Sequence, residues 1–379
     1  SVAGSVIYSD NQEAELARGN GARGEPVNHG WLNFAKQLHN RQLMAERDET
    51  RVFVTINPSV SGKTIEQLSK KNTQDALFRY GRFLDGLQKV QVETKPHTHV
   101  VDGIAWLQGE WNYADHGGSW DKESYKQLLL TLVDDMIADC MTITGQALPP
   151  AFFTYQTGAS YTRDVDSSGT PGLHVGMAQL EVAIEKKHVY MVGPVYPMTD
   201  KGGHLDANGS RWFGCMIGKV WHKVVEQGQH WEPLRPICIS RQGNEVYVEF
   251  HVPEPPLVFD RPYVLSTALD YKDRGFKVTD TSSNTLPIRM VEIVANTVVK
   301  ITLASSPSTA AGLYVWYASQ STGGNGCLRD SDPMTSFDTY EFIPERGMYP
   351  EADVPALVGK RYPLHNWCVA FHLPVGYGD

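Results

Sequence analysis

Three short motifs contain the residue types that nucleophilic and acid–base chemistry requires. Residues 106–112 (WLQGEWN) place the Gln108 amide two positions before the Glu110 carboxylate, and residues 202–209 (GGHLDANG) place His204 in a glycine-rich turn. Residues 57–68 (NPSVSGKTIEQL) place Gly62 shortly before a predicted helix start, where unpaired backbone N–H groups can stabilise an oxyanion. Taken singly, these motifs also fit a surface turn, a packing histidine and an ordinary Ser-Gly turn. Only their combination predicts a function.

The elements that must position these motifs follow a β/α rhythm. Between about residues 30 and 230, short apolar runs alternate with amphipathic stretches, which indicates a parallel sheet covered by helices. Residues 106–112 come directly after one of the predicted strands. Because the carboxyl ends of strands in open α/β sheets line the ligand crevice, polar residues there are well placed to act on a substrate. Strands are predicted at residues 51–57, 99–107, 151–155 and 188–192.

The clearest predicted helix spans residues 122–140. Its apolar residues recur at the i, i+3, i+4 spacing of one buried face: Tyr125, Leu128, Leu129, Leu132, Met136 and Ile137. This spacing predicts a core helix and not a cofactor-binding segment.

The pattern changes after about residue 231. Residues 245–252, 297–303 and 313–318 alternate with period two and are separated by turn-rich segments, which predicts a β-sandwich. Residues 319–326 are rich in Gly and Ser and are typical of a linker. The expected division is a catalytic domain at 1–232, a β-sandwich module at 233–320 and an irregular C-terminal segment at 321–379.

Composition narrows the classes of partner. The chain has 379 residues and a formal net charge of −9, so it offers no electrostatic reason to expect nucleic acid or an anionic membrane surface. The five cysteines are widely spaced and form no CxxC pair, which predicts reduced thiols. His97 and His99 lack a third ligand at a recognisable spacing, so a solvated loop is favoured over a zinc site. No apolar run is long enough to span a membrane, and the first residues lack the pattern of a signal peptide.

Taken together and in this order, the three motifs resemble the SGNH hydrolases. They are most similar to the branch of sialate O-acetylesterases and bacteriophage tail O-acetylesterases, in which a WxQGE block replaces Gly-x-Asn-Asp. Residues 106–110 match that block, Gly62 matches the glycine of the second block, and His204 matches the catalytic histidine. The resemblance extends to residues 255–260 (PPLVFD) and to the Asn-Trp-Cys sequence near the C-terminus. It implies a three-layer α/β/α, flavodoxin-like sheet with a C-terminal β-sandwich.

The resemblance also implies a serine mechanism without metal or organic cofactor. A serine attacks an acetyl carbonyl, His204 takes and returns the proton, and the Gly62 N–H and the Gln108 amide hold the oxyanion. The family's aspartate lies three positions before the histidine, where this chain has Lys201. Glu110 is the first choice for the orienting carboxylate and Asp200 the second. Asp206 is predicted to be a helix cap.

The nucleophile has no clear match. No Gly-Asp-Ser or Gly-Gln-Ser block is present, and only Ser1, Ser5 and Ser9 precede the matching region. We expect the nucleophile to lie upstream of Ser1, with Ser9 and then Ser5 as internal candidates. The first sheet strand is expected to be absent with it, so that a separate N-terminal fragment supplies the serine or an unpaired edge is exposed.

The resemblance sets the expected biology. It implies removal of O-acetyl groups from a bacterial surface polysaccharide, O-antigen or capsule, by a homotrimeric phage tail protein located on the virion or outside the cell. The alternative is a catalytically silent carbohydrate-binding or structural tail module. A peptidase or lipase on the same scaffold is disfavoured, because the WxQGE block indicates sugar esters.

Overall fold

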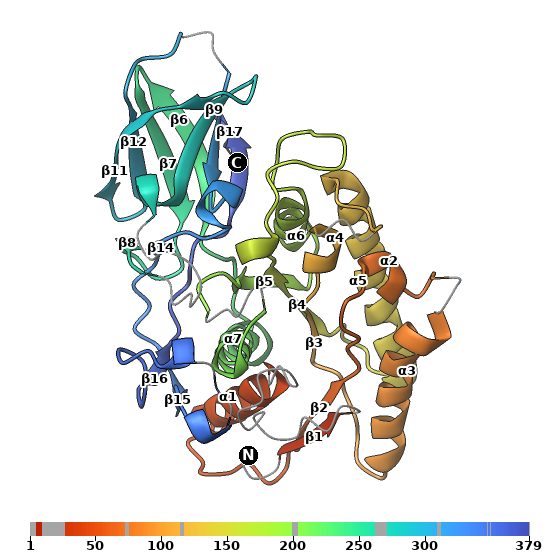
Figure 1. Ribbon diagram of the computed structural model, residues 1–379. Helices are drawn as coiled ribbons and strands as arrows, with labels where there is room; N and C mark the ends of the chain where they lie inside the picture. Colours follow the sequence, from red (N-terminus) through yellow and green to blue (C-terminus); the bar gives the residue numbers. More distant parts are fainter. Residues whose placement is uncertain are drawn as a thin grey trace.

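The computed structural model describes residues 5–9, 27–72, 76–113, 117–198, 204–261, 271–308, 312–346, 348 and 350–378, in an α/β part and a part with antiparallel sheets (Figure 1). The strands of the α/β part are β1 (Ser5–Ser9), β2 (Phe53–Asn57), β3 (Gly103–Trp106), β4 (Ala151–Gln156) and β5 (Val189–Pro194). Its helices are α1 (Val27–Gln42), α2 (Ile65–Leu68), α3 (Ala76–Glu93), α4 (Glu110–Tyr113), α5 (Lys122–Thr144), α6 (His174–Glu185) and α7 (Ala207–Trp221). A short π-helix lies at His222–Glu226. Short 3₁₀-helices lie at Ala159–Tyr161, Lys272–Gly275, Gln320–Thr322, Pro344–Arg346 and Pro350–Ala352.

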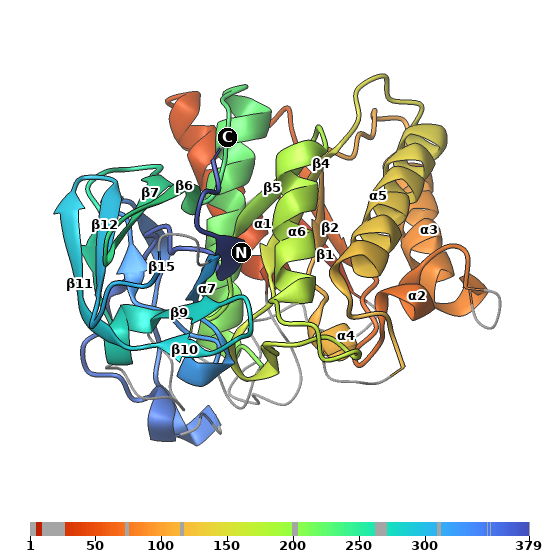
Figure 2. The same ribbon diagram turned by 90° about the horizontal axis from the view of Figure 1, so that it is seen from above.

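The strands of the α/β part pair in parallel, as the sequence predicts. β3, β4 and β5 form a three-stranded parallel sheet, and β1 pairs in parallel with β2. Successive residues of β4 point to opposite faces. Phe153 packs with residues of α1 and α7, whereas Phe152 packs with residues of α3, α5 and α6. Figure 2 shows α1 and α7 on one side of the strands and α3 and α5 on the other. The predicted helix at 122–140 is confirmed within α5.

The expectation that the first strand is absent is wrong. Residues Ser5–Ser9 form β1, which pairs with β2 from Ser5 opposite Phe53 to Ser9 opposite Asn57. Within these five residues only Val6, Ile7 and Tyr8 are apolar, which is too short a run to predict a strand from the sequence. Its pairing with β2, more than forty positions along the chain, supplies what the local pattern lacks.

Two four-stranded antiparallel sheets make up the second part. One has the order β11-β12-β7-β6 and the other β10-β9-β13-β17, and their inward side chains share one apolar core. The bounds are β6 (Arg235–Gln242), β7 (Glu245–His251), β8 (Val258–Phe259), β9 (Phe276–Asp280), β10 (Thr285–Leu286), β11 (Ile288–Ala295), β12 (Val298–Leu303), β13 (Leu313–Tyr317), β14 (Leu328–Arg329), β15 (Thr335–Thr339), β16 (Arg361–Pro363) and β17 (Phe371–Pro374).

Two expectations for the end of the chain need correction. Residues 319–326 are a packed loop and not a linker: Ser319 and Asn325 are buried, and the Gly324 carbonyl accepts a hydrogen bond from the Ala159 N–H at 3.1 Å. The segment 321–379 is not irregular throughout, because its last strand, β17, pairs with β13 and completes a sheet. The predicted boundary at 320 therefore separates two paired strands. β17 has four residues without a clear alternation of apolar and polar side chains, and it pairs with a strand more than fifty positions earlier, so its local pattern did not predict it.

No helix in the part of the chain that the structure describes is both long and apolar enough to cross a membrane.

Candidate active site

The predicted site residues follow the carboxyl ends of neighbouring parallel strands. β2 ends at Asn57 and leads to the Gly62 loop, and β3 ends at Trp106 and leads to Gln108 and Glu110. His204 lies after β5 and directly before α7. The strand ends of such sheets form the ligand crevice. The fold therefore brings these motifs to one edge, as the sequence predicts for residues 106–112.

The Gly62 loop ends in a short, well-capped helix. Gly62 has a φ of +62°, a conformation that favours glycine. Thr64 caps α2 and forms a capping box with Gln67. The Ile65 N–H donates to Asn112 Oδ1 at 3.0 Å. A Cβ atom on Gly62 would lie 3.8 Å from the Trp111 ring, so this loop contacts the loop after β3.

Gln108 is buried, and both the nitrogen and the oxygen of its side-chain amide are hydrogen-bonded within the protein. Its amide nitrogen donates to the Lys63 carbonyl at 3.2 Å and to Asn112 Oδ1 at 2.6 Å. Its side-chain oxygen accepts from the Tyr125 hydroxyl at 2.8 Å. Burial raises the pKa of Tyr125, which keeps this hydroxyl a neutral donor. With both amide hydrogens engaged inside the protein, the observed role of Gln108 is to join the loops after β2 and β3.

Glu110 begins α4, and its carboxylate accepts a hydrogen bond from the Tyr155 hydroxyl. Tyr155 is a buried residue near the carboxyl end of β4. The β3–β4 pairing thus places a hydroxyl donor beside the carboxylate that the sequence selects as the orienting group.

His204 is exposed and contacts a second tyrosine. Its Nε2 lies 3.2 Å from the Tyr161 hydroxyl, and the two rings meet edge to face with centroids 6.0 Å apart. Tyr161 belongs to the short turn that follows β4. The histidine that the sequence selects therefore contacts the turn that follows β4.

The predicted cap at Asp206 is confirmed. Asp206 is the N-cap of α7, and its side chain accepts from the Gly209 N–H at 2.7 Å. This bond fixes the start of α7 two residues after His204. Asp200 and Lys201 lie outside the described residues, as do the side chains of Ser5 and Ser9. The backbone of Ser9 ends β1 beside Asn57.

Sequence reasoning missed Tyr155 and Tyr161. Both lie at or just after the carboxyl end of a predicted strand, which is where substrate-binding groups gather in such sheets. Their position at this strand end is the feature of the sequence that could have identified them as site residues. The contacts to Glu110 and His204 join residues more than forty positions apart, so no local motif contains them.

Comparisons with known proteins concern the fold. No family model matches the sequence, and no curated protein matches it significantly. Two structures of the bacterial S-layer protein SbsC align only loosely. Its N-terminal part aligns with a TM-score of 0.19 and 15% identity, over 34% of this chain and 26% of that one. Its domains 1–6 align with a TM-score of 0.23 and 10% identity, over 82% of this chain and 34% of that one. At such low TM-scores, the two SbsC alignments do not indicate a shared fold. A carbohydrate acetylesterase from Xanthomonas citri aligns over 86% of this chain and 76% of its own, with 14% identity and a TM-score of 0.56. The chain therefore has a fold that resembles that of a carbohydrate acetylesterase.

Proposed function

We propose that the protein is a serine-type carbohydrate O-acetylesterase. The observation that carries the proposal is that Glu110 and His204 each contact a tyrosine at or just after the carboxyl end of β4, Tyr155 and Tyr161 respectively. It is supported by the likeness of the fold to a carbohydrate acetylesterase. An imidazole and a carboxylate at the ligand edge of such a sheet are the groups that activate a hydroxyl nucleophile.

In the proposed reaction, the serine Oγ attacks the carbonyl carbon of a sugar acetyl ester while His204 takes the hydroxyl proton. The tetrahedral intermediate then expels the sugar oxygen, which receives that proton from His204. Water, deprotonated by His204, attacks the carbonyl carbon of the acetyl-serine. The bond to the serine oxygen then breaks, acetate leaves, and His204 returns the proton to the serine oxygen. Glu110, or alternatively Asp200, orients His204.

The proposed oxyanion donors are the Gly62 N–H and the Gln108 amide. Gln108 would have to exchange its bond to the Lys63 carbonyl or to Asn112 Oδ1 for one to the oxyanion. The Gly62 N–H, at the turn before α2, is the donor that requires no such exchange in the side-chain network.

Ser9 is the nucleophile we propose. β1 runs parallel to β2, so Ser9 at its end lies at the edge where the Gly62 loop begins. Ser5 starts the strand and lies about 13 Å away, at about 3.3 Å per residue, toward the opposite edge. The structure thus favours Ser9 over Ser5 by position. A serine upstream of Ser1, contributed by a separate fragment or a preceding segment, stays a prediction.

The proposed substrate is an acetylated bacterial polysaccharide, O-antigen or capsule. The phage-tail setting, the homotrimer and the extracellular location stay predictions from the sequence resemblance. A silent carbohydrate-binding module is the alternative outcome of the test below.

The test is acetate release from an acetylated polysaccharide and from a small aryl acetate. The wild-type chain should release acetate, and folded His204→Ala and Ser9→Ala variants should lose at least about 100-fold in rate. A folded wild-type chain that binds the polysaccharide and releases no acetate would overturn Ser9 as the nucleophile and leave the silent module and a serine upstream of Ser1 as the two remaining hypotheses. An active Ser9→Ala variant would assign the nucleophile to another serine of the same chain, with Ser5 as the first candidate, and an active His204→Ala variant would overturn the site.

A further inference from the structure

The helix that follows His204 is held by a distant part of the chain. We call residues 330–341 and 361–366 the C-terminal brace. The chain leaves the antiparallel part at β14, runs along α7 as the brace, and returns as β17. Residues of α7, β15 and β16 contribute to the same apolar core.

The first turn of α7 makes a set of buried hydrogen bonds with the brace. The Asn208 amide donates to the Glu341 carbonyl at 2.7 Å, and its Oδ1 accepts from the Glu341 N–H at 3.1 Å. The Tyr362 hydroxyl donates to the same Oδ1 at 2.8 Å and accepts from Arg211 Nε at 2.9 Å. Burial raises the pKa of Tyr362, which keeps its hydroxyl protonated. These bonds lie four residues after His204.

The next residues of α7 extend this contact. Trp212 stacks on Tyr362 with ring centroids 5.2 Å apart, and its Nε1–H donates to the Pro363 carbonyl at 2.7 Å. Arg211 donates to the Thr339 carbonyl at 2.7 Å. Two strands of the brace, β15 and β16, are thus tied to one turn of the helix.

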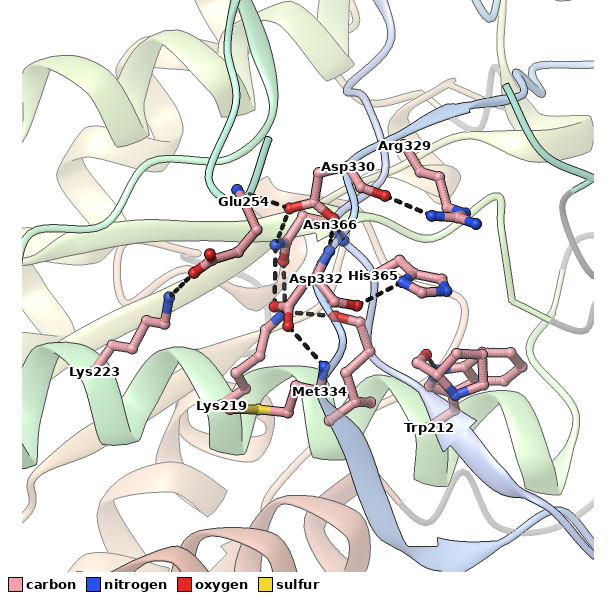
Figure 3. Close-up of polar contacts among 12 residues, drawn as sticks. Trp212, Lys219, Lys223, Glu254, Arg329, Asp330, Asp332, Met334, His365 and Asn366 are labelled. Carbon is pink, nitrogen blue, oxygen red and sulfur yellow. Dashed lines mark hydrogen bonds and ion pairs between the residues drawn. The ribbon is translucent and has the colours of Figure 1, made fainter. Parts of the chain in front are cut away.

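The last turn of α7 is held through Lys219, which points into the brace in Figure 3. Its three donors bind Asp332 Oδ2 at 3.1 Å, the Leu364 carbonyl at 2.6 Å and Asn366 Oδ1 at 2.6 Å. Lys219 is 1% exposed, so a shift of the helix would leave a buried charge without its partners.

A neighbouring face of α7 packs closely on α1. A Cβ atom on Gly214 would lie 2.2 Å from the Val27 carbonyl oxygen, and one on Gly30 would lie 2.1 Å from the Arg211 carbonyl oxygen. Such close backbone contact prevents α7 from moving toward α1. The helix is therefore held by α1 and by the brace from its first turn to its last.

We infer that the C-terminal brace positions the catalytic histidine, with Tyr362 and Asn208 as positioning residues that act through the start of α7. This inference rests on the proposed function of His204. His204 is exposed and joined to α7 by two residues, so the start of α7 sets the place of its backbone. A displacement of about 1 Å at a reacting group can cost about 100-fold in rate.

The test compares Tyr362→Phe with Tyr80→Phe. Tyr362→Phe keeps the ring on Trp212 and loses the bonds to Asn208 and Arg211. Tyr80 is the matched control: it is a buried tyrosine whose hydroxyl donates to Asp139 at 2.9 Å, on α3 and far from α7 in sequence. We expect Tyr362→Phe to lower kcat about 10- to 100-fold and to change the pH profile of kcat/KM, with KM within about twofold of wild type. Tyr80→Phe should lower Tm and leave kcat and the profile unchanged.

A second variant and a second readout complete the experiment. If Tyr362→Phe does not fold, Trp212→Phe, which loses one bond to the brace and keeps an aromatic ring, decides the question. NMR titration of the His204 ring reports its environment without turnover, so a wild-type chain that releases no acetate overturns the proposed function while the titration still tests the brace. Folded variants with wild-type kcat, pH profile and His204 titration would overturn the brace inference.

Discussion

Glu110 and Asp200 compete for the role of orienting carboxylate at the residue scale. The Glu110 carboxylate accepts a hydrogen bond from Tyr155 and is the first choice for this role. If Glu110 orients His204, Glu110→Gln should lower kcat by about 10²- to 10⁴-fold, because a misoriented imidazole cannot accept the serine proton. Asp200→Asn should be mild. The comparison of kcat for the two folded variants checks this, and Tyr155→Phe serves as a control for the lost hydrogen bond. The reverse order of effects would assign the role to Asp200.

Gln108 offers a second test at this scale. The sequence predicts that its amide is an oxyanion donor, whereas the structure shows that amide hydrogen-bonded to Lys63, Asn112 and Tyr125. We predict that Gln108→Ala lowers kcat about 100-fold with little change in KM, as loss of an oxyanion donor does. It should also lower the free energy of unfolding by about 1–3 kcal/mol, because Tyr125 and Asn112 lose a buried partner. Steady-state kinetics and urea denaturation measure the two effects separately.

The control for Gln108→Ala is Gln146→Ala. Gln146 also bonds backbone groups through both ends of its amide, to Val101 and Leu148, but lies before β4 at the other end of the strands. It should lose stability and keep kcat. If Gln108→Ala lost stability alone, Gln108 would be an anchor of the loops and not an oxyanion donor.

The Lys219–Asp332 pair makes the attachment of α7 depend on pH at the scale of elements. Burial raises the pKa of Asp332, but the Lys219 charge and the Met334 N–H outweigh burial and leave that pKa below its ordinary value. A carboxyl group with a lowered native pKa adds stability that is present above its unfolded pKa, about 3.9, and is lost as pH falls through the native value. We expect Asp332→Asn to remove this acid-dependent part of the stability.

Denaturation at pH 7 and at about pH 3 tests that expectation. At pH 7, Asp332→Asn should unfold more easily than wild type by about 3 kcal/mol, since burial lowers the pKa of Lys219 and the Asp332 carboxylate no longer offsets that cost. The difference should shrink on acidification. Asp134→Asn, at an exposed pair with Lys186, is the control and should change stability by less than about 1 kcal/mol. An equal effect of Asp332→Asn at both pH values would contradict the assignment.

The two parts share an apolar core at the scale of the whole molecule. Leu173, Met177 and Leu180 of the α6 region and Tyr196 pack in the same cluster as the antiparallel sheets. Tyr196 also donates to the Cys368 carbonyl at 2.7 Å. The sequence pattern treats residues 233–320 as a separable module, and on that view deletion spares hydrolysis of a small acetyl ester.

The shared core leads us to predict the opposite result. Deleting 233–320 uncovers these four side chains, at about 2 kcal/mol each, which is comparable with a total stability of about 5–15 kcal/mol. It also leaves β17 without β13. We expect an insoluble or unfolded product by circular dichroism, with no ester hydrolysis. A soluble deletion variant with wild-type Tm and activity toward an aryl acetate would show that the modules are independent.

Local patterns sufficed for much of this protein. The period of residues 122–140, the apolar strands and the cap at Asp206 each depend on neighbours within a few positions, so the sequence predicts α5, β2 to β5, β7, β12 and β13. The motifs with Gly62, Gln108 and His204 were found in the same way. Their location at strand ends follows from the β/α rhythm alone.

Contacts between distant segments were decided by the tertiary structure. β1 forms because β2 offers a parallel partner, and β17 because β13 does. The bonds of Tyr155 to Glu110, Tyr161 to His204 and Tyr362 to Asn208 join residues from 43 to 154 positions apart. Side chains that meet only after the chain has packed leave no period, cap or turn in the sequence between them, and the placement of the candidate catalytic groups depends on such contacts.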